Sequence, residues 1–203
     1  AGILNKHLNS LKTEMDGVRL ASDIEYIHRM RVASRRFRNA LDIFSFCFND
    51  KPVQAWQKQA RMITASLGYA RDKDVQIESV QQVMNQVQDR HLLPGFKRLV
   101  LRLQQGRNKL QHKLIKSIDR LETGGELQIM EQAFSGMMLT LPDQPVFSTA
   151  LYRLAWETIV QRLQDMKSYE IFIEDINNTE ELHAMRIMAK KLRYSIEIFS
   201  PLY

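Results

Sequence analysis

The chain has 203 residues, 44% of them hydrophobic, and a formal net charge of +6 from 29 Lys and Arg against 23 Asp and Glu. This apolar content supports a packed core and excludes a disordered chain, while no apolar run reaches the ~18 residues of a membrane span and the start lacks a signal-peptide segment. A single cysteine, Cys47 between Phe46 and Phe48, excludes an internal disulfide and predicts a buried thiol in a reducing compartment, so the expected location is cytoplasmic.

Two helices are predicted at the start of the chain. Apolar residues recur at helical spacing over 3–15, and this helix is expected to end at Asp16-Gly17. Ser22 or Asp23 can cap the next helix, which is predicted to extend to about Phe48.

Two further helices are predicted before residue 90. Asn49-Asp50-Lys51-Pro52 has the composition of a turn, and the apolar spacing over 56–67 predicts a third helix that Gly68 closes or sharply bends. Asp72 and Asp74 stand where a fourth helix is expected to begin, and capping or pairing with an arginine is their favoured role.

The longest helical pattern follows a break at Leu93-Pro94-Gly95 and covers 96–121. Thr123-Gly124-Gly125 is expected to end it. A shorter helix is predicted over 127–137, before a turn at Pro142-Asp143-Gln144-Pro145.

Two more helices complete the pattern, one over 151–166 and a last one capped by Asn177-Asn178-Thr179. No strand-like alternation is present. Eight helices joined by short turns predict an all-α fold of two antiparallel bundles. We expect residues 1–124 to form the first helical half and residues 125–203 the second.

A basic face marks the second predicted helix. The segment from His28 to Arg38 contains five arginines and no acid. At ~100° per residue, four of its side chains fall within an arc of roughly 80° on one side of the helix, opposite Met30 and Phe37. These four are His28, Arg31, Arg35 and Arg38. The pattern predicts a helix that packs by one face and presents fixed cations on the other.

The same pattern returns 155 residues later, from His183 to Arg193, so the chain contains an internal repeat. The matching polar and basic positions are His183, Arg186, Lys190, Lys191 and Arg193, with Tyr194 on the same side. Duplication of a helical unit predicts a pseudo-two-fold arrangement in which both basic faces open onto one groove.

The second half is expected to be incomplete. Counterparts of Trp56 and of the segment 67–75 would fall beyond residue 203. Either the chain is truncated or another copy of the protein supplies the missing part, and a homo-oligomer or a fused enzyme domain is consistent with this pattern.

A second basic stripe is predicted on the long helix over 96–121. Its cations lie within about 60° of a common line over roughly 33 Å. They are Arg98, Arg102, Lys109, Lys113, Lys116 and Arg120, with His112 at the margin.

Three segments resemble the conserved histidine α-helical domain (CHAD) family: 28–44, 67–75 and 182–194. The family signature is a His-x-x-Arg-x-x-x-Arg-Arg-x-Arg helix in each of two helical halves. The resemblance implies an all-helical protein that binds inorganic polyphosphate and localises to polyphosphate granules, in some members beside a triphosphate-hydrolysing tunnel domain.

The residues themselves favour phosphate binding. Arginine offers phosphate a rigid bidentate fork and lysine a mobile point charge, and successive cations on a helix face rise by ~4.5 to 6 Å, a spacing that suits a polymer. The predicted phosphate-binding residues are His28, Arg31, Arg35, Arg36, Arg38, His183, Arg186, Lys190, Lys191, Arg193 and Tyr194. We expect inorganic polyphosphate or a similar polyanion as the partner, with no catalysis, no cofactor, no metal and no membrane association.

Other interpretations stay open at this point. The stripes are also consistent with solvated helix faces, since Asp42 and Glu197 lie one turn beyond Arg38 and Arg193. Nucleic-acid binding is permitted by the charge, although the stripes lack interleaved aromatic residues for base stacking. A metal-dependent phosphohydrolase would use the two histidines with Asp72 and Asp74, without a supporting metal-binding motif.

Overall fold

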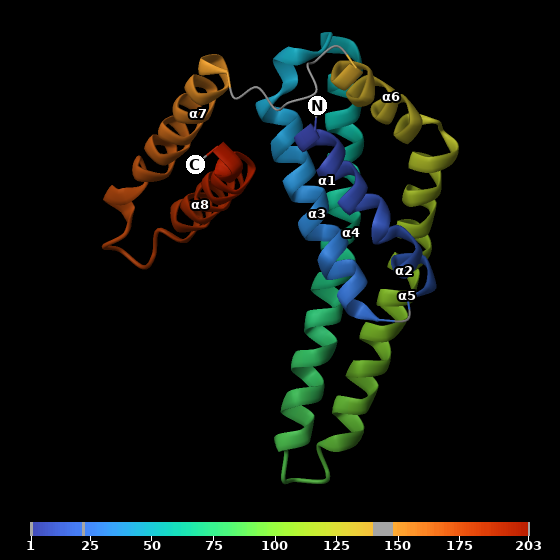
Figure 1. Cartoon of the computed structure of the whole chain (residues 1–203). Helices are drawn as coiled ribbons and strands as arrows, with labels where there is room; N and C mark the ends of the chain where they lie inside the picture. Colours follow the sequence, from blue (N-terminus) through green and yellow to red (C-terminus); the bar gives the residue numbers. More distant parts are fainter. Residues whose placement is uncertain (1, 22, 140–147, 203) are drawn as a thin grey trace.

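The computed structural model describes residues 2–21, 23–139 and 148–202, and all regular structure in these ranges is helical (Figure 1). The helices are α1 (Gly2–Thr13), α2 (Met15–Leu20), α3 (Ile24–Ile43), α4 (Asp50–Gln86), α5 (Leu93–Thr123), α6 (Glu126–Leu139), α7 (Thr149–Lys167) and α8 (Thr179–Phe199), with short 3-10 helices at Ser45–Cys47, Glu170–Phe172 and Ser200–Leu202. The predicted all-α class is confirmed. The expected cap at Ser22 and the turn at 142–145 lie outside the described residues.

The predicted helix end at Asp16-Gly17 is wrong, because Gly17 lies inside α2. A Cβ atom at this position would stand 1.9 Å from Cδ1 of the Tyr26 ring, so the glycine allows α3 to pack closely against α2. The first helix ends earlier, at Thr13, and α2 ends just before Ala21, which has a left-handed φ of 51°.

The start of α3 follows the sequence prediction and its end does not. The Asp23 carboxylate accepts a hydrogen bond from the Glu25 backbone N–H at 2.9 Å and caps the helix. The helix ends at Ile43, five residues before Phe48, because the chain tightens into the Ser45–Cys47 turn. This turn leaves Cys47 exposed, so the prediction of a buried thiol is wrong.

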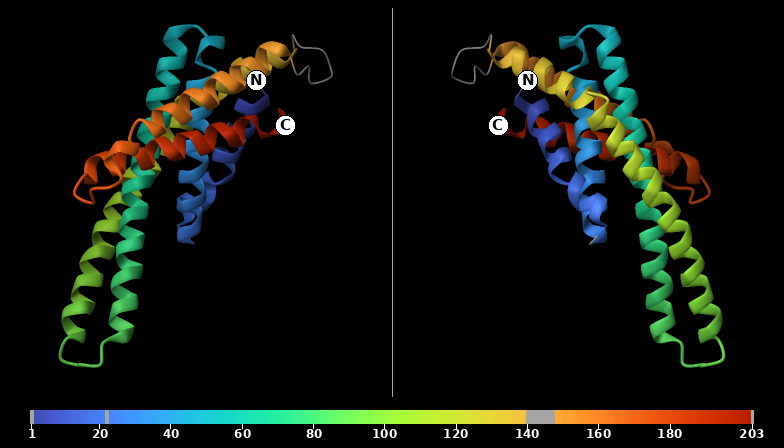
Figure 2. Two further views of the ribbon diagram at one scale, coloured as in Figure 1. Left: turned by 90° about the vertical axis from the view of Figure 1, so that its left-hand side faces the viewer. Right: turned by 90° about the vertical axis from the view of Figure 1, so that its right-hand side faces the viewer.

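The expected third and fourth helices are one continuous helix, the 37-residue α4. Gly68 neither ends nor begins a helix; the guanidinium Nε of Arg31 lies 3.7 Å from the place a Cβ would occupy. Asp74 is not at a helix start but is buried in the helix interior, where it pairs with Arg107 of α5. Beyond this pair, α4 and α5 continue side by side as a long hairpin (Figures 1 and 2).

The core lies where α1, α3, α4 and α6 meet. Phe134 of α6 sits at its centre and packs edge-on or tilted against Phe37, Phe48 and Trp56, with ring centroids 5.5 to 6.4 Å apart. From α1, Leu4, Leu8 and Leu11 fill the same core. This packing fixes α3 with its apolar side inward and its basic side turned away from the core.

The last two helices form a pair, and α8 contacts α3 (Figure 1). Figure 2 shows α8 crossing α3 steeply instead of running parallel to it. The internal repeat and the division at residue 124 stay predictions; α6, assigned by the sequence to the second half, contributes Leu127, Met130 and Phe134 to the core of the first.

Candidate functional site

The crossing of α3 and α8 opens a cleft of about 120 Å³. We call it the α3–α8 cleft. From α3 it is lined by Arg35, Arg38, Asn39 and Asp42, and from α8 by Ile187, Lys190, Lys191 and Tyr194. Five predicted site residues from two distant segments therefore line one cavity: Arg35, Arg38, Lys190, Lys191 and Tyr194.

Polar and aromatic contacts hold the two helices together beside the cleft. The buried Asn39 amide donates to the Ser195 hydroxyl at 3.3 Å, and the Phe44 and Phe199 rings meet edge-on at 6.2 Å. Sequence reasoning assigned no such role to Asn39 or Ser195. Asn39 and Ser195 follow the basic segments of the two repeats, but the sequence alone does not show that the two side chains meet in a buried place.

Positive charge is concentrated at Lys190. Burial lowers the pKa of this ammonium, and four neighbouring guanidinium groups lower it further. These belong to Arg35, Arg186, Arg31 and Arg193. The predicted residues Arg31, Arg186 and Arg193 therefore lie near Lys190, although they are not among the residues that line the cleft.

Arg38 lies in a similar environment. Burial is the main cause that lowers its guanidinium pKa, and Arg61 and Arg35 lower it further, against an opposing contribution from Asp42. Arg61 comes from α4, and the sequence pattern gave no reason to include it. Asp42 accepts a hydrogen bond from the Gln57 amide at 3.0 Å.

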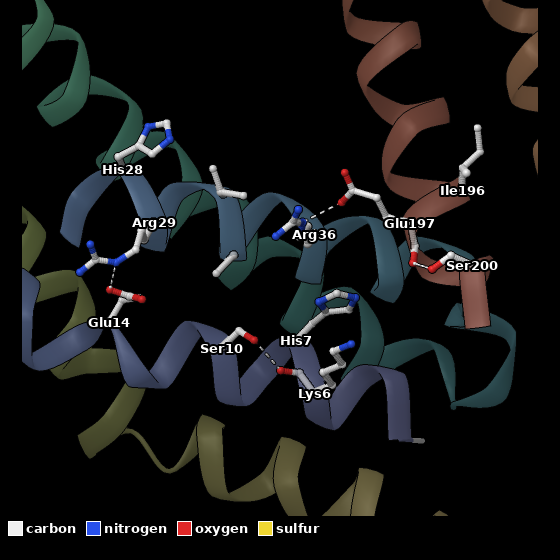
Figure 3. A pocket seen from close by; sticks show the side chains of 12 residues that line it. Lys6, His7, Ser10, Glu14, His28, Arg29, Arg36, Ile196, Glu197 and Ser200 are labelled. Carbon is white, nitrogen blue, oxygen red and sulfur yellow. Dashed lines mark hydrogen bonds and ion pairs between the residues drawn. The ribbon is translucent and has the colours of Figure 1, made fainter. Parts of the chain in front are cut away.

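Arg36 and His28 lie elsewhere. Both line a larger pocket between α1, α3 and α8, where the Arg36 Nε contacts the Glu197 carboxylate at 2.8 Å (Figure 3). Because Arg36 is rotated away from Arg35 and Arg38 around the helix, it meets α8 on the other side of the crossing. It therefore joins the two helices and does not line the cleft.

The pocket that contains Arg36 has mixed charge. Two of its cations are paired, Arg36 with Glu197 and Arg29 with Glu14 at 2.9 Å (Figure 3). His7 also faces it, and burial lowers the pKa of this imidazole, with further lowering by Lys6 and Arg36. The mixed charge makes this pocket less suited to a polyanion than the cleft.

The remaining predicted residues are exposed. His183 is exposed on α8 and is not among the residues that line the cleft or the Arg36 pocket. The second stripe lies on α5, which packs mainly against α4. It does not contribute to the cleft. Arg107, which the sequence analysis did not assign, is a largely buried cation of α5, with its side chain 11% exposed.

The residues invoked for a metal site are arranged differently. Asp74 is in an ion pair with Arg107, and the predicted pairing with an arginine is confirmed. Among the described residues, no three His, Cys, Asp or Glu side chains form a group that could hold a metal ion. Within the same residues, no helix combines the length and apolar character needed to cross a bilayer.

The fold and the site together define an all-α domain in which two basic helices, far apart in sequence, meet at one cationic cleft. The chain matches the CHAD domain family over residues 2–203 and belongs to this family. Its structure is similar to the crystal structure of the CHAD domain from the plant Ricinus communis, with a TM-score of 0.73 and 21% sequence identity. The match covers 98% of this chain and 63% of that one, so this chain spans under two thirds of the plant structure. No curated protein sequence matches the chain.

Proposed function

We propose that the chain binds inorganic polyphosphate in the α3–α8 cleft. The observation that carries this proposal is the convergence of Arg35, Arg38, Lys190 and Lys191 on one cavity, with Asp42 as the one acid among the eight residues that line it. Bringing like charges together opposes folding, and a bound polyanion removes this repulsion.

The size of the site and its surroundings favour a polymer. A cavity of about 120 Å³ holds little more than a phosphate group or two, yet the cations continue beyond it along both helices. Arg31 on α3 and Arg186 and Arg193 on α8 can contact further phosphates of the same strand. Tyr194 is the one aromatic residue among those lining the cleft, which gives nucleic-acid bases little to stack on.

The proposed activity is binding without catalysis. The cleft residues supply hydrogen-bond donors and charge, and no activated nucleophile lies among them. A protein that binds polyphosphate would be found where polyphosphate accumulates in the cell, so we also propose that it associates with polyphosphate granules.

The test is a triple substitution, Arg35→Gln, Arg38→Gln and Lys190→Gln. At ~1.5 to 3 kcal/mol per charged hydrogen bond, the variant should lose several kcal/mol of binding free energy for labelled polyphosphate. The control removes the same charge elsewhere: Lys51→Gln, Lys58→Gln and Lys167→Gln change exposed lysines that do not line the cleft. Circular dichroism checks that both variants fold.

Binding should also weaken steeply with salt, with a log–log slope that approaches one per phosphate contact, by analogy with nucleic acids. Unchanged affinity in the triple variant would refute the cleft as the site. Equal affinity for single-stranded DNA at matched salt would favour a nucleic-acid function instead.

A further inference from the structure

The outer face of α5 carries a row of cations that we call the α5 strip. It consists of Arg98, Arg102, Lys109, Lys113, Lys116 and Arg120, with His112 at its edge. All seven side chains are exposed. The residues that α5 buries, Val100, Leu114, Ile118 and Leu121, lie on the opposite side of the helix.

The acidic residues of α5 that could neutralise this face are already paired with other cations. The helix contains two acids, Asp119 and Glu122. Arg19 of α2 binds both, contacting the Asp119 carboxylate at 3.1 Å and forming an ion pair with Glu122. Arg107, a largely buried cation of the same helix, forms an ion pair with Asp74 of α4.

No described residue forms an ion pair with any of the six Arg and Lys side chains of the strip. Three pairs of like charge stand four residues apart: Arg98 with Arg102, Lys109 with Lys113, and Lys116 with Arg120. Each such pair destabilises a helix by ~0.2 to 0.5 kcal/mol. On α8, by contrast, one cation is paired on its own helix, since Glu197 lies one turn after Arg193 and contacts it at 3.4 Å.

The geometry of the strip suits a linear phosphate polymer. From Lys109 to Arg120 the successive cations rise by ~6, 4.5 and 6 Å along a straight helix. Residues 97–123 contain no Phe, Tyr or Trp, so nothing on the strip stacks on nucleic-acid bases. An inorganic polyanion needs charge alone.

The strip and the α3–α8 cleft lie on different sides of the molecule. Figure 1 shows α8 and α5 on opposite sides of α3 and α4, and the two views of Figure 2 have the α7–α8 pair in front from one side and α5 in front from the other. We propose that the α5 strip is a second polyphosphate site, independent of the cleft, so that one protein molecule can bridge two polyphosphate strands. The choice of ligand rests on the function proposed above. Two separate sites make the chain a cross-linker of long polymers.

The experiment compares three proteins: the wild type, a strip variant with Lys109→Gln, Lys113→Gln and Lys116→Gln, and the cleft variant with Arg35→Gln, Arg38→Gln and Lys190→Gln. Titration calorimetry with a short oligophosphate counts the sites, and light scattering with long-chain polyphosphate detects cross-linked particles. The wild type should bind two oligophosphates and scatter strongly. Each variant should bind one oligophosphate and scatter little.

The outcomes separate the two proposals. If the strip variant keeps two sites and full scattering, the second site is wrong and the cleft proposal stands. If the wild type and the cleft variant each bind one oligophosphate and the strip variant binds none, the strip is the polyphosphate site, and both the cleft proposal and the bridging of two strands are wrong. The strip variant should also unfold at the same or a higher temperature than the wild type, because the substitutions relieve repulsion between exposed cations. A marked loss of thermal stability would mean that these lysines are structural and would overturn the inference.

Discussion

The buried ion pair between α4 and α5 gives a quantitative test of how the hairpin is stabilised. The Asp74 and Arg107 side chains are 4% and 11% exposed, and Nε of the arginine lies 2.7 Å from Oδ1 of the aspartate. The second carboxylate oxygen, Oδ2, is buried without a hydrogen-bond partner among the described residues. Asp74→Ala should therefore destabilise the fold by ~3 to 5 kcal/mol, since it leaves the Arg107 charge buried and unpaired.

Replacing both partners should have the opposite effect. Burial raises the pKa of Asp74 despite the attraction of Arg107, so desolvation of the carboxylate is the larger contribution. The double variant Asp74→Leu with Arg107→Met should equal the wild type or exceed it by ~1 to 4 kcal/mol in urea unfolding followed by circular dichroism. Polyphosphate binding should not change, because neither residue lines the cleft.

The same pair predicts a pH dependence with a definite sign. A carboxyl group whose pKa is raised on folding contributes most to stability below its ordinary pKa, and this contribution is lost as pH rises through the raised value. The wild type should therefore lose stability relative to the double variant as pH rises from about 4, the ordinary value for aspartate. If the double variant were as unstable as Asp74→Ala, this reasoning would be refuted. The attraction between Asp74 and Arg107 would then outweigh the free energy lost by removing both charges from water.

Three further substitutions test the site and the core. Lys190→Met should raise the free energy of unfolding by ~0.2 to 1 kcal/mol, because it relieves repulsion from neighbouring arginines, while weakening polyphosphate binding; a loss of stability would contradict the charge argument. Gly17→Ala should cost ~1 to 3 kcal/mol in urea unfolding because its Cβ would meet the Tyr26 ring, and Tyr26→Ala in the same chain should recover part of this; no recovery would point to another cause. Phe37→Ala should cost ~3 to 5 kcal/mol by removing a ring packed against Phe134, and thermal unfolding close to that of the wild type would show that the core around Phe134 is not as tightly packed as described.

The features that follow from local sequence were the predictable ones. The capping of α3 by Asp23 depends on residues next to each other in the chain, and the sequence predicted it. The predicted bounds of α5 and α7 agree with the structure to within three residues. The cleft residues Arg35 and Lys190 were also identified, because their register on two similar helices is visible in the sequence.

The errors came from contacts between distant residues. The sequence predicted a helix break at Gly68 and a helix start near Asp74, but α4 continues through both positions. Arg31 of α3 lies beside Gly68, and Arg107 of α5 pairs with Asp74, so contacts with other helices override the local preference. Arg36 belongs to the basic segment, yet the steep crossing of α8 places it against Glu197. Helical periodicity already put Arg36 outside the arc that holds Arg35 and Arg38, but it does not encode where or at what angle α8 crosses α3, so the sequence could not show that Arg36 pairs with Glu197.

The two helices that line the cleft are also the place where the α7–α8 pair attaches to the rest of the protein. Around the crossing, α8 is held to α3 by the Asn39–Ser195 hydrogen bond, the Arg36–Glu197 ion pair and the Phe44–Phe199 contact. A polymer bound between Arg35 and Lys190 would add a non-covalent cross-link between the two helices. Binding would then raise the free energy of unfolding by ~2.7 kcal/mol when the ligand is present at a hundred times its Kd. Without polyphosphate, the α7–α8 pair would detach from α3 more readily, and bound polyphosphate would make this local opening less favourable.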